Sequence, residues 1–351
     1  MVVRKVLAGL LLLSVAASCG PATISTLRSS GAPHGIDIGA AVSADPLAND
    51  PIYAKTLARE FSMLTPENAM KFDSAHPARY EYDFRDADAI VNFAEAHGLK
   101  VRGHTLVWHE QLPPWLTEGH WTRDELVGIL REHITTVVGR YRGRVTVWDV
   151  VSEAIDDNGS LRDTIWLRGI GPEYIELAFQ WAHEADPSAL LFYNDYGGED
   201  MGAKSDAIFA LARGLLEKGA PIHGVGLETH VGTDWYPEPE EVAANMRRLA
   251  DLGLQTHVTE IDVKVRTPAN RKDVLAQSRI YRQMLEACLS AENCRVFSFW
   301  GFTDRYSWIP DFFPGWGSAL IFDRSYRQKP AYYKLLNTLR SHPAKQREEH
   351  E

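Results

Sequence analysis

The chain of 351 residues has only three cysteines and no basic patch. Its net charge of −10 is spread along the sequence, which argues against nucleic acid as a partner and fits a neutral substrate better than a phosphorylated one. No spacing of His, Cys, Asp or Glu is typical of a metal site, so we expect neither a metal nor another cofactor. The apolar run over residues 6–13 is too short to cross a bilayer as a stable helix.

Residues 1–19 have the features of an export signal. Arg4 and Lys5 precede the apolar run and small residues follow it, so we expect removal of this segment and export to the periplasm or the outside of the cell. The stretch Ala16-Ala17-Ser18-Cys19 also resembles the recognition box of bacterial lipoproteins, in which Cys19 would be lipidated, although leucine is usual at position 16. Both a lipid anchor in the membrane and simple secretion remain open.

The other two cysteines, Cys288 and Cys294, lie close together in the sequence. In an exported protein such a pair is more often a disulfide than a metal site, and no further ligand lies nearby. We expect a structural disulfide that joins the end of a helix to the start of the next strand.

The sequence predicts one folded domain over residues 35–340. Residues 20–34 are rich in Ser, Thr, Gly and Pro and are predicted to form a linker, and the charged residues 341–351 are predicted to be a disordered tail. Neither a second domain nor an internal repeat is visible, and we expect a monomer. Short apolar runs alternate with longer amphipathic ones, which predicts strands at 36–41, 61–64, 101–107, 145–151, 190–193, 224–227, 257–261 and 296–302.

Several of the predicted helices have clear end signals. Thr122 and Glu125 form a capping box at the start of one helix, and Gly98 and Gly253 suit the left-handed cap that ends two others. Eight strand-then-helix units predict an α/β fold, a single (β/α)8 TIM barrel. An open doubly wound sheet is less favoured, because no glycine-rich phosphate loop follows the first strand.

Two of the predicted strands each have a glutamate at their C-terminal end, Glu153 and Glu260. In a (β/α)8 barrel the C-terminal ends of the strands share one rim, where catalysis takes place. Two carboxyl groups on that rim are what hydrolysis of a glycosidic bond requires, since one donates a proton and the other attacks or stabilises the sugar cation. The plain alternative is an ordinary loop glutamate at each position. Further polar and aromatic residues gather at the other strand ends: Glu67, Asn68, Lys71, His104, Trp108, Gln111, Asn194, Tyr196, Glu228, His230, Asp262 and Trp300.

These segments resemble glycoside hydrolase family 10, the endo-1,4-β-xylanases, from about residue 35 to 339. The most specific motifs are Glu67-Asn68-x-Met70-Lys71, Gly103-His104-Thr105-Leu106-Val107-Trp108-His109, Trp148-Asp149-Val150-Val151-x-Glu153 and Thr259-Glu260-Ile261-Asp262, with Trp300-Gly-Phe-Thr-Asp-x-Tyr-Ser-Trp308 as further support. The resemblance implies internal cleavage of β-1,4-xylosidic bonds in xylan or xylo-oligosaccharides.

By this resemblance, Glu153 is the general acid/base and Glu260 the nucleophile of a retaining mechanism, with their carboxyl groups about 5–5.5 Å apart. Burial and a nearby negative charge should raise the pKa of Glu153, and hydrogen bonds from groups such as His230 should keep Glu260 ionised. Asp262 is expected to orient His230, with a plain surface aspartate as the alternative.

The remaining site residues are assigned to substrate binding by the same resemblance. Trp300 and Trp308 are expected as aromatic walls against sugar rings, although a buried tryptophan is more often part of a core. Asn194 and Tyr196 fit contacts on the leaving-group side, and Asn194 equally suits a turn. The pocket on the non-reducing side of the cleaved bond is expected to contain Glu67, Asn68, Lys71, His104 and Trp108, with Gln111 close by.

Three positions depart from the family pattern. Ser152 stands where asparagine usually donates to the sugar 2-hydroxyl, and Glu228 stands where glutamine is usual. Phe72 replaces a usual tryptophan, which we expect to keep an aromatic wall. Ser152 and Glu228 leave open the same mechanism on another β-glycoside, such as a β-glucan or an aryl glycoside. A non-catalytic carbohydrate-binding protein is a third reading, but it would need neither Glu153 nor Glu260.

Overall fold

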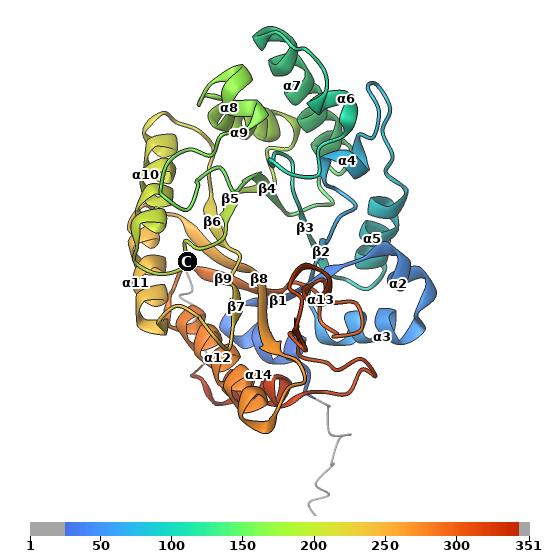
Figure 1. Ribbon diagram of the computed structural model, residues 1–351, viewed down its shortest axis with the longest axis vertical. Helices are drawn as coiled ribbons and strands as arrows, with labels where there is room; N and C mark the ends of the chain where they lie inside the picture. The colour runs from blue at the N-terminus through green and yellow to red at the C-terminus, as the bar shows by residue number, and fades with distance from the viewer. Residues whose placement is uncertain (1–24, 344–351) are drawn as a thin grey trace, which may run out of the picture.

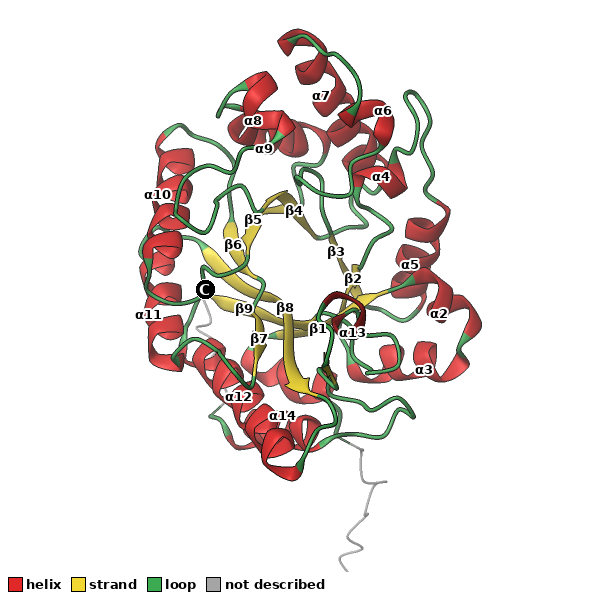
Figure 2. Ribbon diagram, viewed as in Figure 1, coloured by secondary structure: helices red, strands yellow, loops and turns green. Residues whose placement is uncertain are grey.

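The computed structural model describes residues 25–343, and within them eight parallel strands form a closed barrel surrounded by helices (Figures 1 and 2). The barrel strands are β1 (Asp37–Val42), β2 (Met63–Pro66), β3 (Lys100–Gly103), β4 (Val147–Ser152), β5 (Leu190–Asp195), β6 (Gly224–Leu227), β8 (Gln255–Arg266) and β9 (Cys294–Phe299). Each pairs with the next in chain order, and the parallel pairing of β9 with β1 closes the barrel. The predicted (β/α)8 architecture is confirmed.

The longer helices form the outer ring that Figure 2 shows in red. They are α3 (Pro51–Glu60), α5 (Arg85–Ala96), α7 (Arg123–Arg140), α9 (Tyr174–Ala185), α10 (Ala203–Glu217), α11 (Pro239–Ala250), α12 (Arg271–Ser290) and α14 (Pro330–Ser341). The predicted capping box at Thr122 opens α7, and Gly98 and Gly253, with φ of 61° and 78°, follow α5 and α11. No helix among residues 25–343 combines the length and the apolar character that a membrane span needs.

Shorter elements decorate the loops of the barrel. They are α2 (Ala44–Asn49), α4 (Phe72–Ala75), α6 (Pro114–Thr117), α8 (Ile165–Ile170), α13 (Ile309–Phe312), and the strands β7 (His230–Gly232) and β10 (Trp316–Gly317). Both short strands pair with the C-terminal half of β8, which extends beyond the barrel to Arg266. The predicted third strand, 101–107, was too long: β3 ends at Gly103, and beyond it only an isolated bridge between Val107 and Val151 continues the pairing with β4.

The linker predicted over residues 20–34 is wrong for its second half. Residues 27–31 form α1 and residues 32–34 a short 3-10 helix, and Leu27 is fully buried. The backbone N–H of Leu27 donates to Glu60, and the Arg28 guanidinium donates to the carbonyl of Gly98, just before β3. The His34 ring nitrogen Nε2 lies 2.6 Å from the carbonyl oxygen of Leu339 in α14. The polar composition of the segment concealed these few specific contacts.

The other predictions for the chain ends mostly concern residues that the structure does not describe. The export signal over residues 1–19 and the lipidated Cys19 lie outside the described residues, as does the predicted tail 341–351 from residue 344 on. They therefore stay predictions. Ser341, the first residue of that predicted tail, is the last residue of α14.

A buried ionic network occupies the interior of the barrel below the strand ends. Arg102 of β3 and Asp149 of β4 form an ion pair, and both side chains are essentially inaccessible to water. A guanidinium nitrogen of Arg102 also lies 2.8 Å from Nδ1 of His257 in β8. A charge in this position is stable only because its partners are fixed. The network ties together three strands, two of which lead directly to predicted catalytic residues.

The predicted disulfide between Cys288 and Cys294 is confirmed. Cys288 lies in the last turns of α12 and Cys294 begins β9, so the bond joins the end of a helix to the following strand. It lies outside the site region and its role is structural.

Candidate active site

Backbone hydrogen bonds bring the C-terminal strand ends to one rim. The N–H of Glu153 donates to the carbonyl of Asn194 at 2.9 Å, and the N–H of Glu228 donates to that of Asp195 at 3.1 Å. The N–H of Glu260 then donates to the carbonyl of Glu228 at 3.1 Å. Four predicted site residues therefore follow one another around the barrel, with no insertion between their strands.

Glu153 has a backbone conformation that is rare for a residue with a side chain. Its φ of 55° is in the left-handed region, which costs of order 1–3 kcal/mol and is found preferentially at functional sites. Its side chain is only 14% exposed. Burial, then the negative charge of Asp195, raises the pKa of Glu153 to about 7. This carboxyl group therefore holds a proton close to neutral pH.

Glu260 is in the opposite electrostatic situation although it is also buried. Burial opposes its ionisation, but the charge of His104 and the hydrogen bond from His230 outweigh that effect and lower the pKa of Glu260. The Oε1 atom accepts a hydrogen bond from Nδ2 of Asn194 at 2.8 Å, and Oε2 lies 3.3 Å from Nε2 of His230. The two predicted catalytic carboxyl groups thus differ in how readily they ionise.

His230 is held between Glu260 and Asp262. Its Nδ1 atom lies 3.0 Å from Oδ2 of Asp262, and the same oxygen accepts a 2.8 Å hydrogen bond from Nε1 of Trp308. Burial disfavours the imidazolium, but the charges and hydrogen bonds of Asp262 and Glu260 prevail and raise the pKa of His230 to about 10. Both ring nitrogens then donate protons. The predicted orienting contact between Asp262 and His230 is present.

The potential ligand atoms of Glu228, His230 and Glu260 lie within 4.8 Å of one another, which invites the question of a metal ion. A metal would need a lone pair on a ring nitrogen of His230. Because both nitrogens carry protons that are directed at Asp262 and Glu260, the imidazolium has none to offer. The three residues therefore fit a hydrogen-bonded cluster better than a metal centre.

The amide of Asn194 lies between two carboxyl groups. Its Nδ2 atom donates to Oε1 of Glu228 at 2.9 Å as well as to Glu260, while its Oδ1 atom accepts from the hydroxyl of Thr259 at 2.8 Å. Burial, followed by the charges of Glu260 and Glu153, raises the pKa of Glu228 well above its ordinary value. Asn194 is fully buried and acts as a bridge in the site, so the turn alternative is wrong for this residue.

A second group of polar residues follows β2 and β3. Nζ of Lys71 donates to Asn68 at 3.1 Å and to Gln111 at 2.7 Å, and it lies 4.8 Å from the ring centre of Trp108. Burial lowers the pKa of Lys71 against the opposing charges of Glu260 and Glu67. The hydroxyl of Ser43 donates to the carboxyl group of Glu67. Lys71 is thus a buried member of the site rather than a surface lysine.

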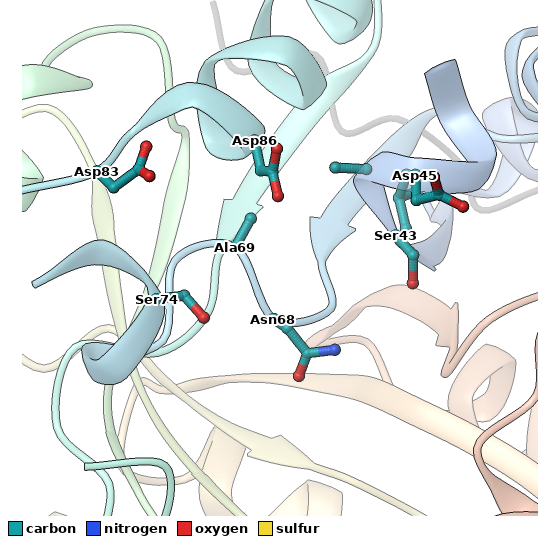
Figure 3. Close-up of a pocket in the computed structure, with 9 residues that line it drawn as sticks. Ser43, Asp45, Asn68, Ala69, Ser74, Asp83 and Asp86 are labelled. Atoms are coloured by element: carbon teal, nitrogen blue, oxygen red, sulfur yellow. The ribbon is translucent and has the colours of Figure 1, made fainter. Parts of the chain in front are cut away.

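A pocket of about 240 Å³ lies beside this group (Figure 3). Asn68, Ser43 and Ser74 contribute neutral polar groups to its lining, and Asp45 and Asp86 contribute carboxylates (Figure 3). Such a lining accepts hydrogen bonds and therefore suits a ligand rich in hydroxyl groups better than an anion. The pocket is separate from the two catalytic carboxyl groups but adjoins Asn68.

The predicted aromatic walls differ in exposure. Trp300 is 7% exposed and meets the His104 ring edge-on at 5.0 Å, whereas Trp308 is partly exposed and meets the His230 ring at 5.1 Å. His104 itself lies 3.1 Å from Asp149 and 3.7 Å from Glu260. The interior ionic network therefore reaches the nucleophile side of the site through one histidine.

Ser152 has a partner within the protein, and Phe72 is used differently from our expectation. The Ser152 hydroxyl is buried and 2.8 Å from that of Thr105, so its short side chain is already engaged within the protein. Phe72 does not form a wall of the cleft: it is 3% exposed and stacks on His133 at 3.8 Å, in the core beneath α7. The phenyl ring lies among other buried aromatic rings, and the expectation for Phe72 is wrong for that reason.

Sequence reasoning missed two residues near Glu153. Nε of Arg162 donates to the backbone carbonyl of Glu153 at 2.9 Å, and another of its nitrogens donates to the hydroxyl of Tyr196. Nδ1 of His109 lies 3.9 Å from the Glu153 carboxyl group, and burial lowers the pKa of His109 to about 4. His109 stood in a motif without a role assigned to it. No motif in the sequence marks Arg162, because its loop comes close to the site only in the folded protein.

A parallel (β/α)8 barrel whose strand-end rim carries one protonated and one ionised carboxyl group has the arrangement that a glycoside hydrolase requires. Comparison with known proteins gives the family. The family model for glycosyl hydrolase family 10 matches residues 26–338, and the chain belongs to this family.

Related proteins cover most of the chain. Endo-1,4-beta-xylanase B of Thermotoga neapolitana is 47% identical over 287 residues, covering 81% of this chain and 82% of that protein. The beta-1,4-xylanase of Dictyoglomus thermophilum is 42% identical over 314 residues, covering 85% of this chain and 87% of that protein. Xylanase 10B of Thermotoga petrophila, solved in complex with xylobiose, has a TM-score of 0.89 and 42% identity, covering 92% and 99% of the two chains.

Proposed function

We propose that this protein is an endo-1,4-β-xylanase that cuts internal β-1,4-xylosidic bonds in xylan by a retaining double displacement. The observation that carries the proposal is the unequal pair of carboxyl groups on one rim: the pKa of Glu153 is about 7, and that of Glu260 is below its ordinary value. An acid and a nucleophile are therefore available together near neutral pH.

In the first step, the protonated Glu153 donates its proton to the glycosidic oxygen as the bond to the anomeric carbon breaks. The ionised Glu260 attacks that carbon and forms a covalent glycosyl-enzyme. The sugar chain beyond the broken bond leaves with its new hydroxyl group. His230 and Asn194 hold the two oxygens of Glu260 through hydrogen bonds, which fixes the direction of attack.

In the second step, Glu153 is a carboxylate and accepts a proton from an incoming water molecule. The water oxygen attacks the anomeric carbon on the face that the leaving group vacated, and Glu260 departs as a carboxylate. Two inversions give net retention. Loss of the covalent bond restores the negative charge of Glu260, which the His230 imidazolium stabilises.

The choice of xylan rests on the family and on related proteins. Solved structures of similar xylanases contain xylobiose and, in an intracellular xylanase of Thermoanaerobacterium saccharolyticum with a TM-score of 0.83 and 38% identity, xylotetraose. In our protein Lys71, Asn68 and Gln111 supply a fixed set of polar groups beside Trp108, which suits sugar hydroxyls next to an apolar ring face.

Incubation with unbranched xylan followed by sizing of the products tests this function. Short oligomers of several lengths are expected, because internal bonds are cut. Release of monomer alone would identify an exo-acting enzyme, and absence of any product would favour a binding protein. Aryl xylobioside and aryl cellobioside extend the test to the sugar itself, and a clear preference for cellobioside would contradict xylan as the substrate.

Two variants test the assigned roles. We expect Glu260→Ala to abolish hydrolysis of every substrate while the fold is retained. We expect Glu153→Ala to lose activity on xylan but to keep the glycosylation step on a dinitrophenyl xylobioside, whose leaving group needs no proton. Equal losses of Glu153→Ala on both substrates would contradict its role as the acid.

We also propose that the protein is exported, on the basis of the signal features in residues 1–19. The mass of the mature N-terminus tests this proposal. Lipidation adds acyl groups to a chain that begins at Cys19, and simple secretion gives an unmodified chain. Retention of Met1 in the mature protein would contradict export.

A further inference from the structure

Glu228 is a third carboxyl group beside the catalytic pair, and most of the titratable groups that act on it are further carboxyl groups. It is 3% exposed, and one of its oxygens lies within 4.8 Å of an oxygen of Glu260. The charged groups that act on it come from six elements: Glu153 after β4, Asp195 of β5, Glu199 in the next loop, Glu260 and His230 on the neighbouring strands, and Lys71 after β2. Carboxyl groups outnumber cations in this set.

The Asn194 amide limits what Glu228 can be. Glu260 is ionised and can only accept hydrogen bonds, so Nδ2 of Asn194 faces the carboxyl groups. Its two protons go one to Glu228 and one to Glu260, and Oδ1 accepts from the hydroxyl of Thr259. Gly226 makes room for this arrangement, since a Cβ atom there would lie 2.1 Å from Oδ1 of Asn194. The orientation of the Asn194 amide is thereby fixed, and both of its N–H protons are engaged. It can offer no second hydrogen bond to Glu228.

The other oxygen of Glu228 lacks a close cation. Oε2 lies 3.9 Å from Nε2 of His230, which is too far for a hydrogen bond, and that nitrogen is directed at Glu260. The His230 imidazolium is therefore the hydrogen-bond partner of Glu260 and not of Glu228. A second full negative charge beside Glu260 would make ionisation of the nucleophile harder, just as two carboxyl groups in one site share a proton.

We propose that Glu228 acts as a neutral carboxylic acid throughout catalysis and, through Asn194, positions the nucleophile without adding charge to it. Its Oε1 atom accepts from Asn194, and the proton sits on Oε2, so the group presents one acceptor and one donor. A glutamine side chain likewise presents an acceptor oxygen beside a donor group, although its NH2 carries two protons. Glu228 is therefore a positioning residue for the reaction assigned above, and the inference rests on that assignment for its role but not for its protonation.

The protonation is measured directly in the whole protein. Glutamate labelled with carbon-13 at the side-chain carboxyl group is incorporated, and the resonance that disappears in Glu228→Gln is assigned to Glu228. We expect this resonance to stay at the position of a protonated carboxyl group from pH 4 to pH 8. A resonance that titrates in this range would overturn the proposal, whatever the substrate of the enzyme.

The kinetic arm compares Glu228→Gln with Glu228→Ala. We expect the pH profile of kcat/KM for Glu228→Gln to superimpose on that of the unchanged protein, within about threefold in rate. Glu228→Ala should lose about 10-fold or more, because the buried Asn194 proton loses its acceptor. If Glu228 were ionised, glutamine would remove a charge, and both limbs of the profile would move to lower pH by about one unit.

The two arms remain decisive if one variant fails to fold. The variants Glu153→Gln and Glu260→Gln then assign the carbon-13 resonances of Glu153 and Glu260. Of the other glutamate resonances, the one that shifts in both variants is assigned to Glu228. Failure of the enzyme to cut xylan would leave the titration result intact, so the two conclusions are separable.

Discussion

Removing the charge of Asp262 while preserving its shape should convert His230 from a permanent cation into a group that titrates near neutral pH. Asp262→Asn is a close match, because Oδ2 accepts from both His230 and Trp308, whereas Oδ1 is buried and has no hydrogen-bond partner. The amide oxygen can take the place of Oδ2. The largest cause that raises the His230 pKa to about 10 is then removed, and the pKa should fall toward its ordinary value of 6.5.

The sign of the effect follows from this shift. At pH 5 the ring is still protonated in Asp262→Asn, so its rate should stay within a few-fold of the unchanged protein. At pH 8 the ring is neutral, Nδ1 keeps its proton for the introduced amide oxygen, and Nε2 faces Glu260 with a lone pair. Loss of a hydrogen bond to a charged group costs about 1.5–3 kcal/mol, which is about 10- to 100-fold in kcat/KM.

The assay is the pH dependence of kcat/KM on dinitrophenyl xylobioside from pH 5 to pH 9, since this leaving group makes the rate independent of the Glu153 proton. Trp308→Phe is the control, because it removes the other donor to the same oxygen without changing any charge. Its effect should be equal at all pH values. A profile for Asp262→Asn that parallels the unchanged protein would refute the reasoning about His230.

Further expectations concern stability and the alkaline limit. Activity on xylan should decline above about pH 7, as Glu153 loses its proton. An alkaline decline that begins below pH 5 would contradict the assignment of Glu153 as the acid. The folded protein holds the Glu153 proton from the ordinary pKa of 4.5 up to about 7, so stability falls as pH rises through this window. In urea unfolding, Glu153→Gln should therefore exceed the unchanged protein by about 3 kcal/mol of unfolding free energy at pH 8 and equal it at pH 4. The same difference at both pH values would contradict the raised pKa of Glu153. Replacing Cys288 and Cys294 by alanine should cost about 2 kcal/mol of unfolding free energy at full activity, measured in the same way; a loss of activity would contradict a purely structural disulfide.

The barrel and the catalytic pair were predictable because their signals are local. Most barrel strands contain a short apolar run, and Glu153 and Glu260 each lie at the C-terminal end of such a run. Capping at Thr122 and the glycines after α5 and α11 depend on neighbouring residues only. In a (β/α)8 barrel the C-terminal ends of all strands lie on one rim, so the predicted fold alone places Glu153 and Glu260 on the same side of the molecule.

The environment of these residues was not predictable, because it depends on closure of the barrel. Asn194 was expected on the leaving-group side, but it bridges two carboxyl groups that lie 34 and 66 positions away in the sequence. The ionic network of Arg102 joins strands that are distant in the sequence. The residues next to Arg102 do not indicate that Asp149 and His257 are its partners. Phe72 was misassigned for a related reason, since aromatic character alone does not distinguish a cleft from a core.

The docking of α1 determines how the enzyme would stand on a surface. Arg28 contacts the carbonyls of Ala58 and Gly98, which precede β2 and β3, so the described chain starts at the end of the barrel opposite to Glu153 and Glu260. An attachment upstream of residue 25 would therefore leave the rim that carries Glu153 and Glu260 on the side of the barrel away from that attachment.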